Sequence, residues 1–195
     1  MSYTPSFDRF PKFFDPIFGQ AKGLIEIRCL PSRDQLFSRN NLEIEKFIQN
    51  HIGENVYFGV STRKDKDGSK AGVFEIPALW ADIDWKDLPG GRADADDRLK
   101  AFPLKPSIAV MSGHGYQPYW ILNQLQEANL EIEGYLKGIT ESLHGDRSAA
   151  EIARILRVPG TFNYKYGDKI LVTLRDDNGL RYNLHDFDNW HVEVS

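Results

Sequence analysis

The chain has 195 residues, of which 41% are hydrophobic and 12% aromatic, enough to build the core of one globular domain. Its formal net charge is −4, from 24 basic and 28 acidic residues, which excludes a globally basic nucleic-acid-binding protein and leaves only a local basic patch for that role. The sequence shows neither a signal peptide nor an apolar run of 18 residues, so we expect a cytoplasmic protein with no membrane partner.

The first third of the chain predicts an N-terminal arm, two strands and a helix between the strands. Residues 1–20 predict a leading arm or short helix that packs on the domain through its aromatic side chains. Strands are expected at 23–30 and 55–61, and a helix from Ser32 to about residue 51. The single cysteine, Cys29, is expected in the core, and its being alone excludes an internal disulfide. The aromatic residues of the arm are Phe7, Phe10, Phe13, Phe14 and Phe18.

Residues 62–72 predict an exposed loop, and an apolar strand at about 76–85 follows it and carries two aspartates. Residues i and i+2 of a strand point to the same face, so Asp82 and Asp84 are expected to aim together. Adjacent carboxylates repel, and a hard divalent cation with oxygen ligands would relieve that repulsion. The alternative is a polar strand end facing solvent, which Asp-x-Asp alone does not exclude.

Residues 107–123 predict two strands joined by a tight turn. Gly113 and Gly115 would let the backbone approach a ligand closely. The turn would display Ser112, His114 and Gln117 at or near its tip. A plain hairpin with a polar tip is the alternative.

The last third of the chain predicts two helices and closing strands. One helix is expected at 126–144. A second is expected to start at Ser148, with Glu151 completing a capping box, and to end at Pro159-Gly160. Arg154 and Arg157 would then share one helical face. Residues 169–175 and 190–194 predict strands, and the absence of a strict βαβ rhythm favours an α+β (mixed α/β) fold.

Charge changes sign along the chain. Residues 82–98 carry six acidic and three basic residues, a net of −3, whereas residues 147–181 carry seven basic and four acidic residues, a net of +3. Carboxylates hold metal ions, and guanidinium and ammonium groups hold phosphates, so this division suits a metal–polyphosphate complex. A salt-bridged surface would give the same count.

Three stretches, in this order, resemble the archaeo-eukaryotic primase superfamily, in particular the primase-polymerases of plasmids, phages and CRISPR-linked loci. The first is Ala81-Asp82-Ile83-Asp84. The second runs from Ser112 to Trp120, with Gln117 where the family often has histidine and His114 at a usually variable place. The third is Asp146 followed by Arg154-Ile155-Leu156-Arg157-Val158-Pro159-Gly160-Thr161-Phe162-Asn163-Tyr164-Lys165. The resemblance covers roughly residues 23–175.

The resemblance implies an archaeo-eukaryotic primase-like core with an RRM-like sheet that carries the catalytic carboxylates. It implies a single catalytic domain over 1–195, with an arm at 1–20, a core at 23–175 and a closing segment at 176–195. The implied activity is that of a template-dependent DNA primase-polymerase that uses two-metal nucleotidyl transfer. The implied partners are a single-stranded DNA template, a primer, nucleoside triphosphates, and a helicase or accessory domain in a longer parent chain.

The resemblance also implies roles for individual residues. Asp82, Asp84 and Asp146 would hold two Mg²⁺ or Mn²⁺ ions, with Asp146 preferred over Glu151 because Glu151 is the expected capping-box partner. Arg63 would contact the template. The residues expected to grip the nucleotide are Ser112, His114, Gln117, Arg154, Arg157, Asn163 and Lys165.

Two other classes share part of this pattern. Another metal-dependent phosphodiesterase or nuclease would need the carboxylates but not the downstream basic residues. A non-catalytic nucleic-acid-binding replication module would need the basic residues but has no reason to keep three carboxylates together. The order of the three motifs favours the primase-polymerase over both.

Overall fold

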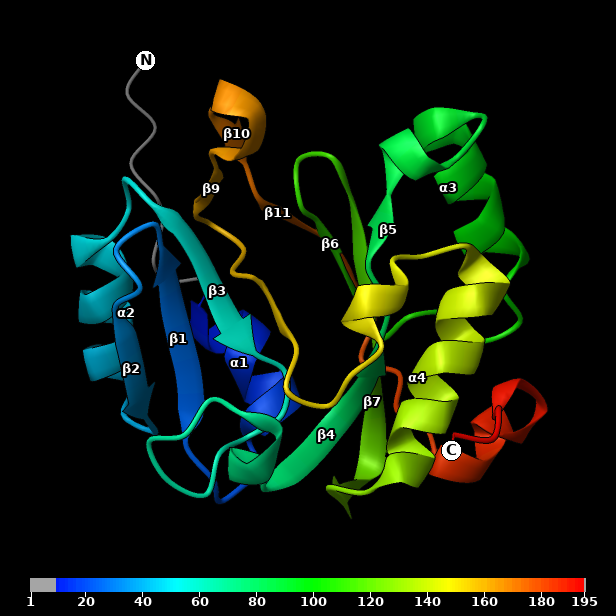
Figure 1. Ribbon diagram of the computed structural model, residues 1–195, viewed down its shortest axis with the longest axis horizontal. Coiled ribbons are helices and arrows are strands. Elements are labelled where there is room, and N and C mark those ends of the chain that lie inside the picture. Colours follow the sequence, from blue (N-terminus) through cyan, green and yellow to red (C-terminus); the bar gives the residue numbers. More distant parts are fainter. Residues whose placement is uncertain (1–9, 195) are drawn as a thin grey trace.

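The computed structural model describes residues 10–194, which form two antiparallel sheets lying side by side (Figure 1). The first sheet has the order β2-β1-β3-β8, with strands Gln35–Ser38, Ile25–Leu30, Asn55–Gly59 and Ile155–Arg157. The second has the order β11-β6-β7-β4, with strands Thr173–Asp177, Ile108–Met111, Gly115–Glu127 and Glu75–Trp80, and β5 (Ile83–Asp84) pairs with β7. A small ribbon joins β9 (Phe162–Asn163) to β10 (Ile170–Leu171).

Helices cover the outer sides of the two sheets (Figure 1). The helix α2 (Asn41–Asn50) flanks the first sheet, and α3 (Gly91–Ala101) and α4 (Leu130–Leu143) flank the second. Five short 3₁₀ segments complete this part of the chain: η2 (Lys70–Gly72), η3 (Trp85–Asp87), η4 (Arg147–Ala149), η5 (Lys165–Gly167) and η6 (Leu184–Trp190). Within residues 10–194, no helix is both long enough and apolar enough to cross a membrane.

The remaining helix, α1 (Phe10–Phe18), joins the two sheets through aromatic packing. The ring of Phe13 lies 5.2 Å from that of Phe58 in β3 and 6.0 Å from that of Tyr119 in β7, centroid to centroid. The expected short helix is therefore confirmed for residues 10–18 and its packing role for Phe13, Phe14 and Phe18, while Phe7 and the side chain of Phe10 lie outside what the structure describes. Buried aromatic rings of this size contribute strongly to core stability.

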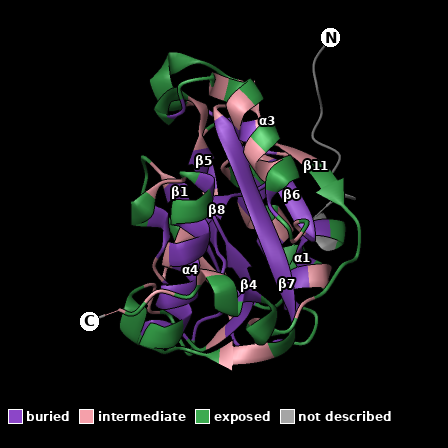
Figure 2. Ribbon diagram, turned by 90° about the vertical axis from the view of Figure 1, so that its right-hand side faces the viewer, coloured by how far each residue is buried: buried purple, intermediate pink, exposed green. Residues whose placement is uncertain are grey.

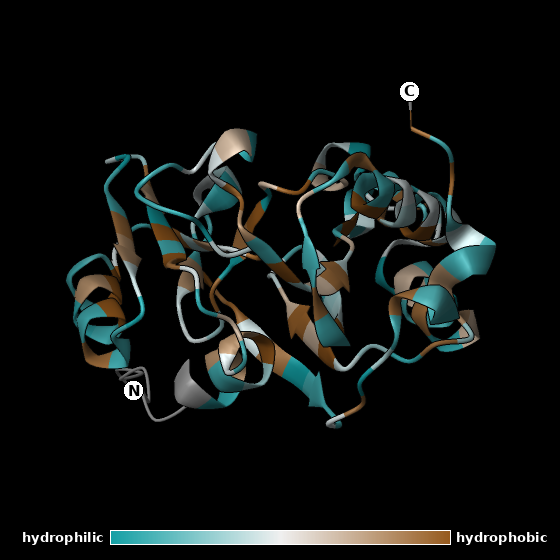
Figure 3. Ribbon diagram, turned by 90° about the horizontal axis from the view of Figure 1, so that it is seen from below, coloured by the Kyte–Doolittle hydropathy of each residue, from teal (hydrophilic) through white to brown (hydrophobic). Residues whose placement is uncertain are grey.

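The core is continuous between the two sheets. It contains Cys29, as expected, together with Trp80, Tyr119 and Trp120, all fully buried. The first eight residues of β7 are buried, and Figure 2 shows this strand as a long buried element. Figure 3 shows hydrophobic and hydrophilic residues alternating over helices and strands. The central position of β7 matters because its first residues also line the candidate site.

Two of the predicted helices are wrong in part or in whole. The first helix does not start at Ser32: residues 35–38 pair with β1 as β2, and Asn40 then caps α2 by accepting hydrogen bonds from the Leu42 and Glu43 amides. The second helix, predicted from Ser148 to Pro159, is absent. Asp146 caps the short η4 instead, and Ile155–Arg157 pairs with β3 as β8, so sheet pairing overrides the local capping pattern.

The other predicted elements agree more closely with the structure. The strands at 23–30 and 55–61, the hairpin at 107–123 and the helix at 126–144 are confirmed as β1, β3, β6–β7 and α4, with shifted ends. The strand predicted at 169–175 corresponds to β10 and β11. The strand predicted at 190–194 is wrong, because residue 190 ends η6 and residues 191–194 have no regular structure.

One glycine fixes how β5 meets β7. A Cβ atom on Gly115 would lie 2.0 Å from the Ile83 carbonyl oxygen, so only glycine allows β5 to pair at this point. The neighbouring Gly113 has a φ of 101°, which lets the turn between β6 and β7 close. The two glycines of the turn therefore place Asp84 against β7.

We predict that Gly115→Ala lowers the free energy of unfolding by about 2 kcal/mol, because the backbone at Ile83 must move to admit the methyl group. Urea unfolding measures this change. Gly53→Ala is the matched control, since its added Cβ meets nothing within 4 Å, and we expect its stability to stay within about 0.5 kcal/mol of the parent. Equal stability of the two variants would contradict the close approach at Gly115.

Candidate active site

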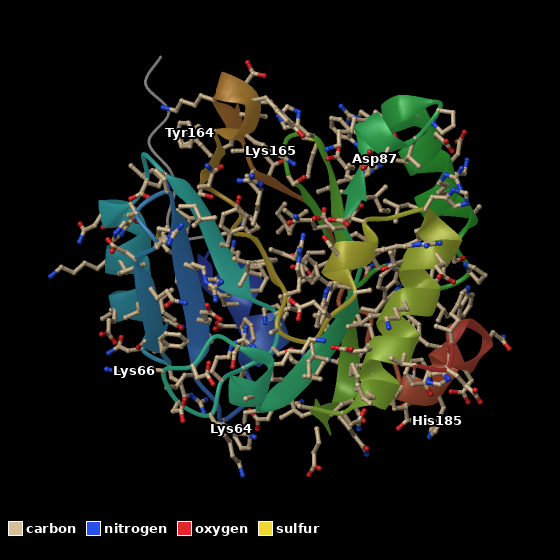
Figure 4. The ribbon with its side chains drawn as sticks, viewed as in Figure 1. Lys64, Lys66, Asp87, Tyr164, Lys165 and His185 are labelled. Carbon is tan, nitrogen blue, oxygen red and sulfur yellow. The ribbon has the colours of Figure 1, made fainter. Side chains whose placement is uncertain are left out.

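A cavity of about 150 Å³ lies between the two sheets and collects most of the residues singled out in the sequence. Figure 4 shows Lys165 between the sheets, whereas Lys64, Lys66 and His185 lie at the periphery. The cavity is lined by Tyr57, Asp82, Asp84, Ser112, His114, Gly115, Gln117, Arg154, Ile155, Arg157, Asn163 and Lys165. Asp146 lies beside this cavity, and Arg63 is not among its lining residues.

Asp82 and Asp84 both line the cavity, although they do not share one continuous strand. Asp82 lies between β4 and β5, and Asp84 ends β5. The alternation predicted for the preceding strand holds for Ala81 and Ile83, which are fully buried. Burial raises the pKa of Asp82, against the opposing effects of Arg154 and of the hydrogen bond from Gln117.

Arg154 connects two of the three predicted carboxylates. Its Nη2 atom lies 3.7 Å from Asp82 Oδ2 and 3.5 Å from Asp146 Oδ2. The backbone reinforces this arrangement, because the Asp146 amide donates to the Asp82 carbonyl oxygen at 2.7 Å. Burial acts to raise the pKa of Asp146, but hydrogen bonds from Ser148 and the charge of Arg154 lower it overall. The guanidinium group is thus the counterion of both carboxylates.

Asp84 has its own cations. Lys86 Nζ lies 3.4 Å from Asp84 Oδ2, and Lys165 Nζ lies 4.0 Å from the same oxygen. Lys86 Nζ also donates to the Tyr166 hydroxyl at 3.1 Å, and this hydrogen bond lowers the pKa of that phenol. All the carboxylates of the site therefore face positively charged side chains.

The three carboxylates are ligands that suit a hard divalent ion, but each of them is paired with a positively charged side chain. Carboxylate oxygens are the ligands that Mg²⁺ and Mn²⁺ prefer. Among residues 10–194, no three side chains of histidine, cysteine, aspartate or glutamate are grouped closely enough to hold a metal ion. A divalent ion at Asp82 and Asp146 would have to displace Arg154, which now provides the balancing charge.

Gln117, one of the two candidates for the polar residue of the second motif, forms hydrogen bonds within the protein. It is buried, its Nε2 donates to Asp82 Oδ1 at 3.3 Å, and its Oε1 accepts from the Arg157 amide at 3.0 Å. His114 differs, because its ring lies edge-on to Tyr166 at 5.2 Å and its buried Nε2 has no hydrogen-bond partner among residues 10–194. A buried polar atom without a partner at a cavity is a natural contact for a ligand.

Ser112 and Asn163 hold the walls of the cavity. Ser112 Oγ donates to the Gly115 carbonyl oxygen at 3.2 Å. Asn163 Nδ2 donates to the Ser112 carbonyl oxygen at 2.7 Å, and Asn163 Oδ1 accepts from the Lys165 amide at 2.8 Å. Asn163 thereby ties the β9 segment to the turn after β6, which places Lys165 near Asp84.

The structure changes the expected roles of two arginines. Arg157 lies in β8 and not on a helical face with Arg154; its Nη1 donates to Asn55 Oδ1 at 2.8 Å, and burial lowers its pKa. Arg63 is fully buried and paired with Glu26 at 2.8 Å, so its side chain offers no surface to a nucleic acid. The expectation that Arg63 contacts the template is corrected: it stabilises the interior.

Sequence reasoning assigned no role to Lys86, Tyr166 or Glu26. Lys86 had a signal, since it follows Asp84 by two residues, a spacing that allows a contact within the same turn. Tyr166 had none, because its place at the cavity depends on a left-handed residue (φ of 66°) in η5. Glu26 is a buried acid in an apolar strand, which predicts a buried cationic partner.

Comparisons with known proteins identify the fold. No family model matches the chain. A curated replication protein from Clostridium perfringens is 27% identical over 146 residues, which cover 70% of this chain and 35% of the relative. The match thus spans about a third of that relative's length.

Solved structures match more of the chain. The archaeo-eukaryotic primase domain of the cyanophage S-2L primase-polymerase superposes with a TM-score of 0.72 at 12% identity, covering 95% of this chain and 97% of that one. The catalytic domain of primase RepB′, solved with initiator DNA, gives 0.64 at 16% identity, covering 91% and 88%. A further structure of primase RepB′ gives 0.59 at 18% identity, covering 90% and 57%.

The chain therefore has the α+β fold of the archaeo-eukaryotic primase-polymerases, and the resemblance found in its motifs is confirmed at the level of the fold. The roles of the individual site residues stay predictions.

We predict opposite effects on stability at pH 7, without divalent ions, from Asp82→Asn and Asp146→Asn. The pKa of Asp82 is raised on folding, so its ionised form opposes folding and Asp82→Asn raises the free energy of unfolding. The pKa of Asp146 is lowered, so its ionised form favours folding and Asp146→Asn lowers the free energy of unfolding. Urea unfolding in EDTA measures both changes.

The pH dependence of the two stability changes tests whether the shifted pKa values cause them. The gain from Asp82→Asn shrinks as the pH falls toward the raised pKa, where the wild-type carboxyl already holds a proton. The loss from Asp146→Asn persists to lower pH and disappears only below its lowered pKa. Effects of the same sign at pH 7 would contradict this account.

Proposed function

We propose that this chain is a template-dependent DNA primase-polymerase domain, which makes primers and extends them from nucleoside triphosphates by nucleotidyl transfer. The observation that carries the proposal is that Asp82 and Asp84 line the same cavity as Arg154, Lys165 and His114. Carboxylates on one side and phosphate-binding groups on the other are what a metal–nucleotide complex requires.

Each group then has a task. Asp82, Asp84 and Asp146 would hold Mg²⁺ or Mn²⁺, whose charge makes an attacking 3′-hydroxyl easier to deprotonate and offsets the charge of the departing pyrophosphate. Arg154 and Lys165 would bind phosphate oxygens of the nucleoside triphosphate through charged hydrogen bonds. His114 Nε2, which is buried at the cavity and has no partner in the described part of the chain, would add one more hydrogen bond.

The other residues expected to contact the nucleotide hold the walls of the cavity in place through hydrogen bonds within the protein. Gln117 fixes one oxygen of Asp82, and Asn163 fixes the turn at Ser112 and the start of η5. Arg157 contributes positive charge at the cavity wall while its own hydrogen bond goes to Asn55. These residues determine where the reacting groups lie, which is a large part of catalysis by phosphoryl-transfer enzymes.

The comparisons support the partners proposed here. The RepB′ catalytic domain was solved with initiator DNA, and the Clostridium relative is a replication protein. We accordingly propose single-stranded DNA template, a primer and nucleoside triphosphates as ligands. A helicase or accessory domain in a longer parent chain is part of the same proposal.

We predict labelled short products when the protein is incubated with single-stranded template, all nucleotides and Mg²⁺ or Mn²⁺. Asp84→Asn should lower product formation by roughly a hundredfold or more, because the charge that holds the metal ions is lost. Asp87→Asn is the matched control, since Asp87 is exposed and does not line the cavity. Template degradation would instead assign a nuclease, and binding without product a non-catalytic module.

We further predict that Arg154→Gln binds Mn²⁺ several-fold more tightly than the wild type in the absence of nucleotide, because it removes the cation that competes for Asp82 and Asp146. The same variant should lose nucleotide affinity. Electron paramagnetic resonance of free Mn²⁺ measures the first effect. Arg147→Gln serves as the control, since Arg147 is largely exposed and 3.9 Å from Glu141. Weaker Mn²⁺ binding by Arg154→Gln would refute competition.

A further inference from the structure

A row of directly paired residues crosses the first sheet, from its β2 edge to the candidate active site. Gln35 pairs with Arg28, Arg28 with Tyr57, and Tyr57 with Arg157. Residues directly opposite each other in antiparallel strands project to the same face. We call these four residues the cross-strand row; at one end Tyr57 and Arg157 line the cavity that holds Asp82 and Asp84.

The cross-strand row lies on the less covered face of this sheet. Ile27 and Cys29, which alternate with Arg28 along β1, point to the opposite face and are fully buried. Arg28 keeps 29% of its side chain exposed, and Gln35 is exposed at the edge. The row is therefore open at its outer end and leads inward to the cavity.

The charge of this face is positive. Glu26 projects beside the row and is shared by two arginines, with Arg28 Nε at 2.9 Å and Arg63 Nε at 2.8 Å. Arg157 adds a third guanidinium group, whose hydrogen bond goes to the neutral Asn55. The row itself therefore carries two guanidinium groups and no carboxylate, in a chain whose overall charge is −4, and the carboxylate of Glu26 beside it is paired with Arg28 and with the buried Arg63. Such a local excess suits an anionic ligand.

The outer end of the row opens into a second cavity, of about 530 Å³, and no acid among residues 10–194 lines it, although Arg28 and Gln35 both donate to the buried Glu26 carboxylate behind its wall. Its walls include Arg28, Gln35 and Arg33, and Gly68 and Ser69 of the neighbouring loop close one side. Arg33 has a φ of 68°, a left-handed conformation that is unusual for arginine. The turn between β1 and β2 therefore presents a second exposed guanidinium group at this cavity.

Tyr57 is half-buried within the row and lines the first cavity. The guanidinium carbon of Arg157 lies 4.8 Å from the centre of its ring, on the side of the active site. The row crosses three strand intervals of about 4.8 Å, roughly 14 Å in all, which is room for a few consecutive nucleotides. Aromatic rings flanked by arginine bind bases of single strands by stacking, while the arginines bind the phosphates.

We propose that the cross-strand row is a binding track for single-stranded DNA, which leaves the active site over Tyr57 and passes Arg28 to reach Arg33. A base stacks on Tyr57, and phosphates contact Arg28 and Arg33. A duplex cannot use this track, because its paired and stacked bases do not reach a ring set in the face of a sheet. The assignment of the strand as template or primer rests on the proposed function; the binding itself does not.

The test is fluorescence anisotropy with a labelled oligothymidylate and with a duplex of equal length, in EDTA so that no chemistry occurs. We expect Tyr57→Leu to weaken single-strand binding about tenfold and Tyr57→Phe to retain wild-type affinity, since stacking needs the ring and not the hydroxyl. Arg33→Gly should weaken binding and reduce the salt dependence by about one phosphate contact, a slope change of roughly 0.7. Glycine accepts the backbone conformation at residue 33, so folding is preserved.

Lys46→Gln is the matched control, because Lys46 is exposed on α2, the helix that flanks the first sheet. It should bind like the wild type. Unchanged affinity of both Tyr57→Leu and Arg33→Gly, or equal binding of duplex and single strand, would overturn the proposal. Equal competition by a nucleoside triphosphate alone would also overturn it and assign the row to a mononucleotide.

The outcome is separable from that of the proposed function. If the wild type makes no product but the Tyr57 and Arg33 variants still lose single-strand affinity, the track stands and the nucleotidyl-transfer proposal falls. If the wild type makes primers and these variants bind and synthesise as well as it does, the track falls and the proposed activity stands.

Discussion

Charge balance among closely placed carboxylates is the constraint on which the centre of this protein depends. The Asp146 amide donates to the Asp82 carbonyl oxygen, and both side chains contact the same Arg154 Nη2 atom. Repulsion between them opposes folding, and the Arg154 guanidinium, which contacts both, offsets part of it. Asp84 obtains the same compensation from Lys86 and Lys165. The protein thus carries its counterions within the site.

This constraint explains why the basic residues lie where they do. Arg154 precedes β8, which pairs with β3 in the first sheet, whereas Asp84 lies in β5 of the second sheet and Asp82 immediately precedes that strand. The Arg154–Asp82 ion pair therefore joins the first sheet to the edge of the second, across the cavity that both residues line. Under the proposed function, phosphate or metal ions would compete for the same side chains, so the ion pairs of the site would exchange partners and the groups that neutralise one another would bind the ligand.

The sequence allowed the fold class and most of the cavity to be predicted, because these depend on local patterns. The apolar run before Asp82 predicts the buried strand, and the glycines predict the tight β6–β7 turn. Gly115 in particular is required, since a Cβ there would collide with the Ile83 carbonyl oxygen. The roles of Arg63 and Arg157 were not predictable. Arg63 is buried because it pairs with the carboxylate of Glu26, 37 positions earlier in the chain. Arg157 was expected on a helix, but its segment pairs with β3 as a strand instead. Both errors come from long-range contacts that local periodicity does not encode.

Gln117 has a consequence beyond its place in the cavity wall. One amide side chain accepts a hydrogen bond from β8 in the first sheet and donates one to Asp82 in the second. An amide does not titrate, so the direction of both bonds is the same in acid and in base. A histidine at this position would exchange a donor for an acceptor near neutral pH. With glutamine, the hydrogen bonds that link the two sheets keep the same donors and acceptors whatever the protonation state of the neighbouring carboxylates.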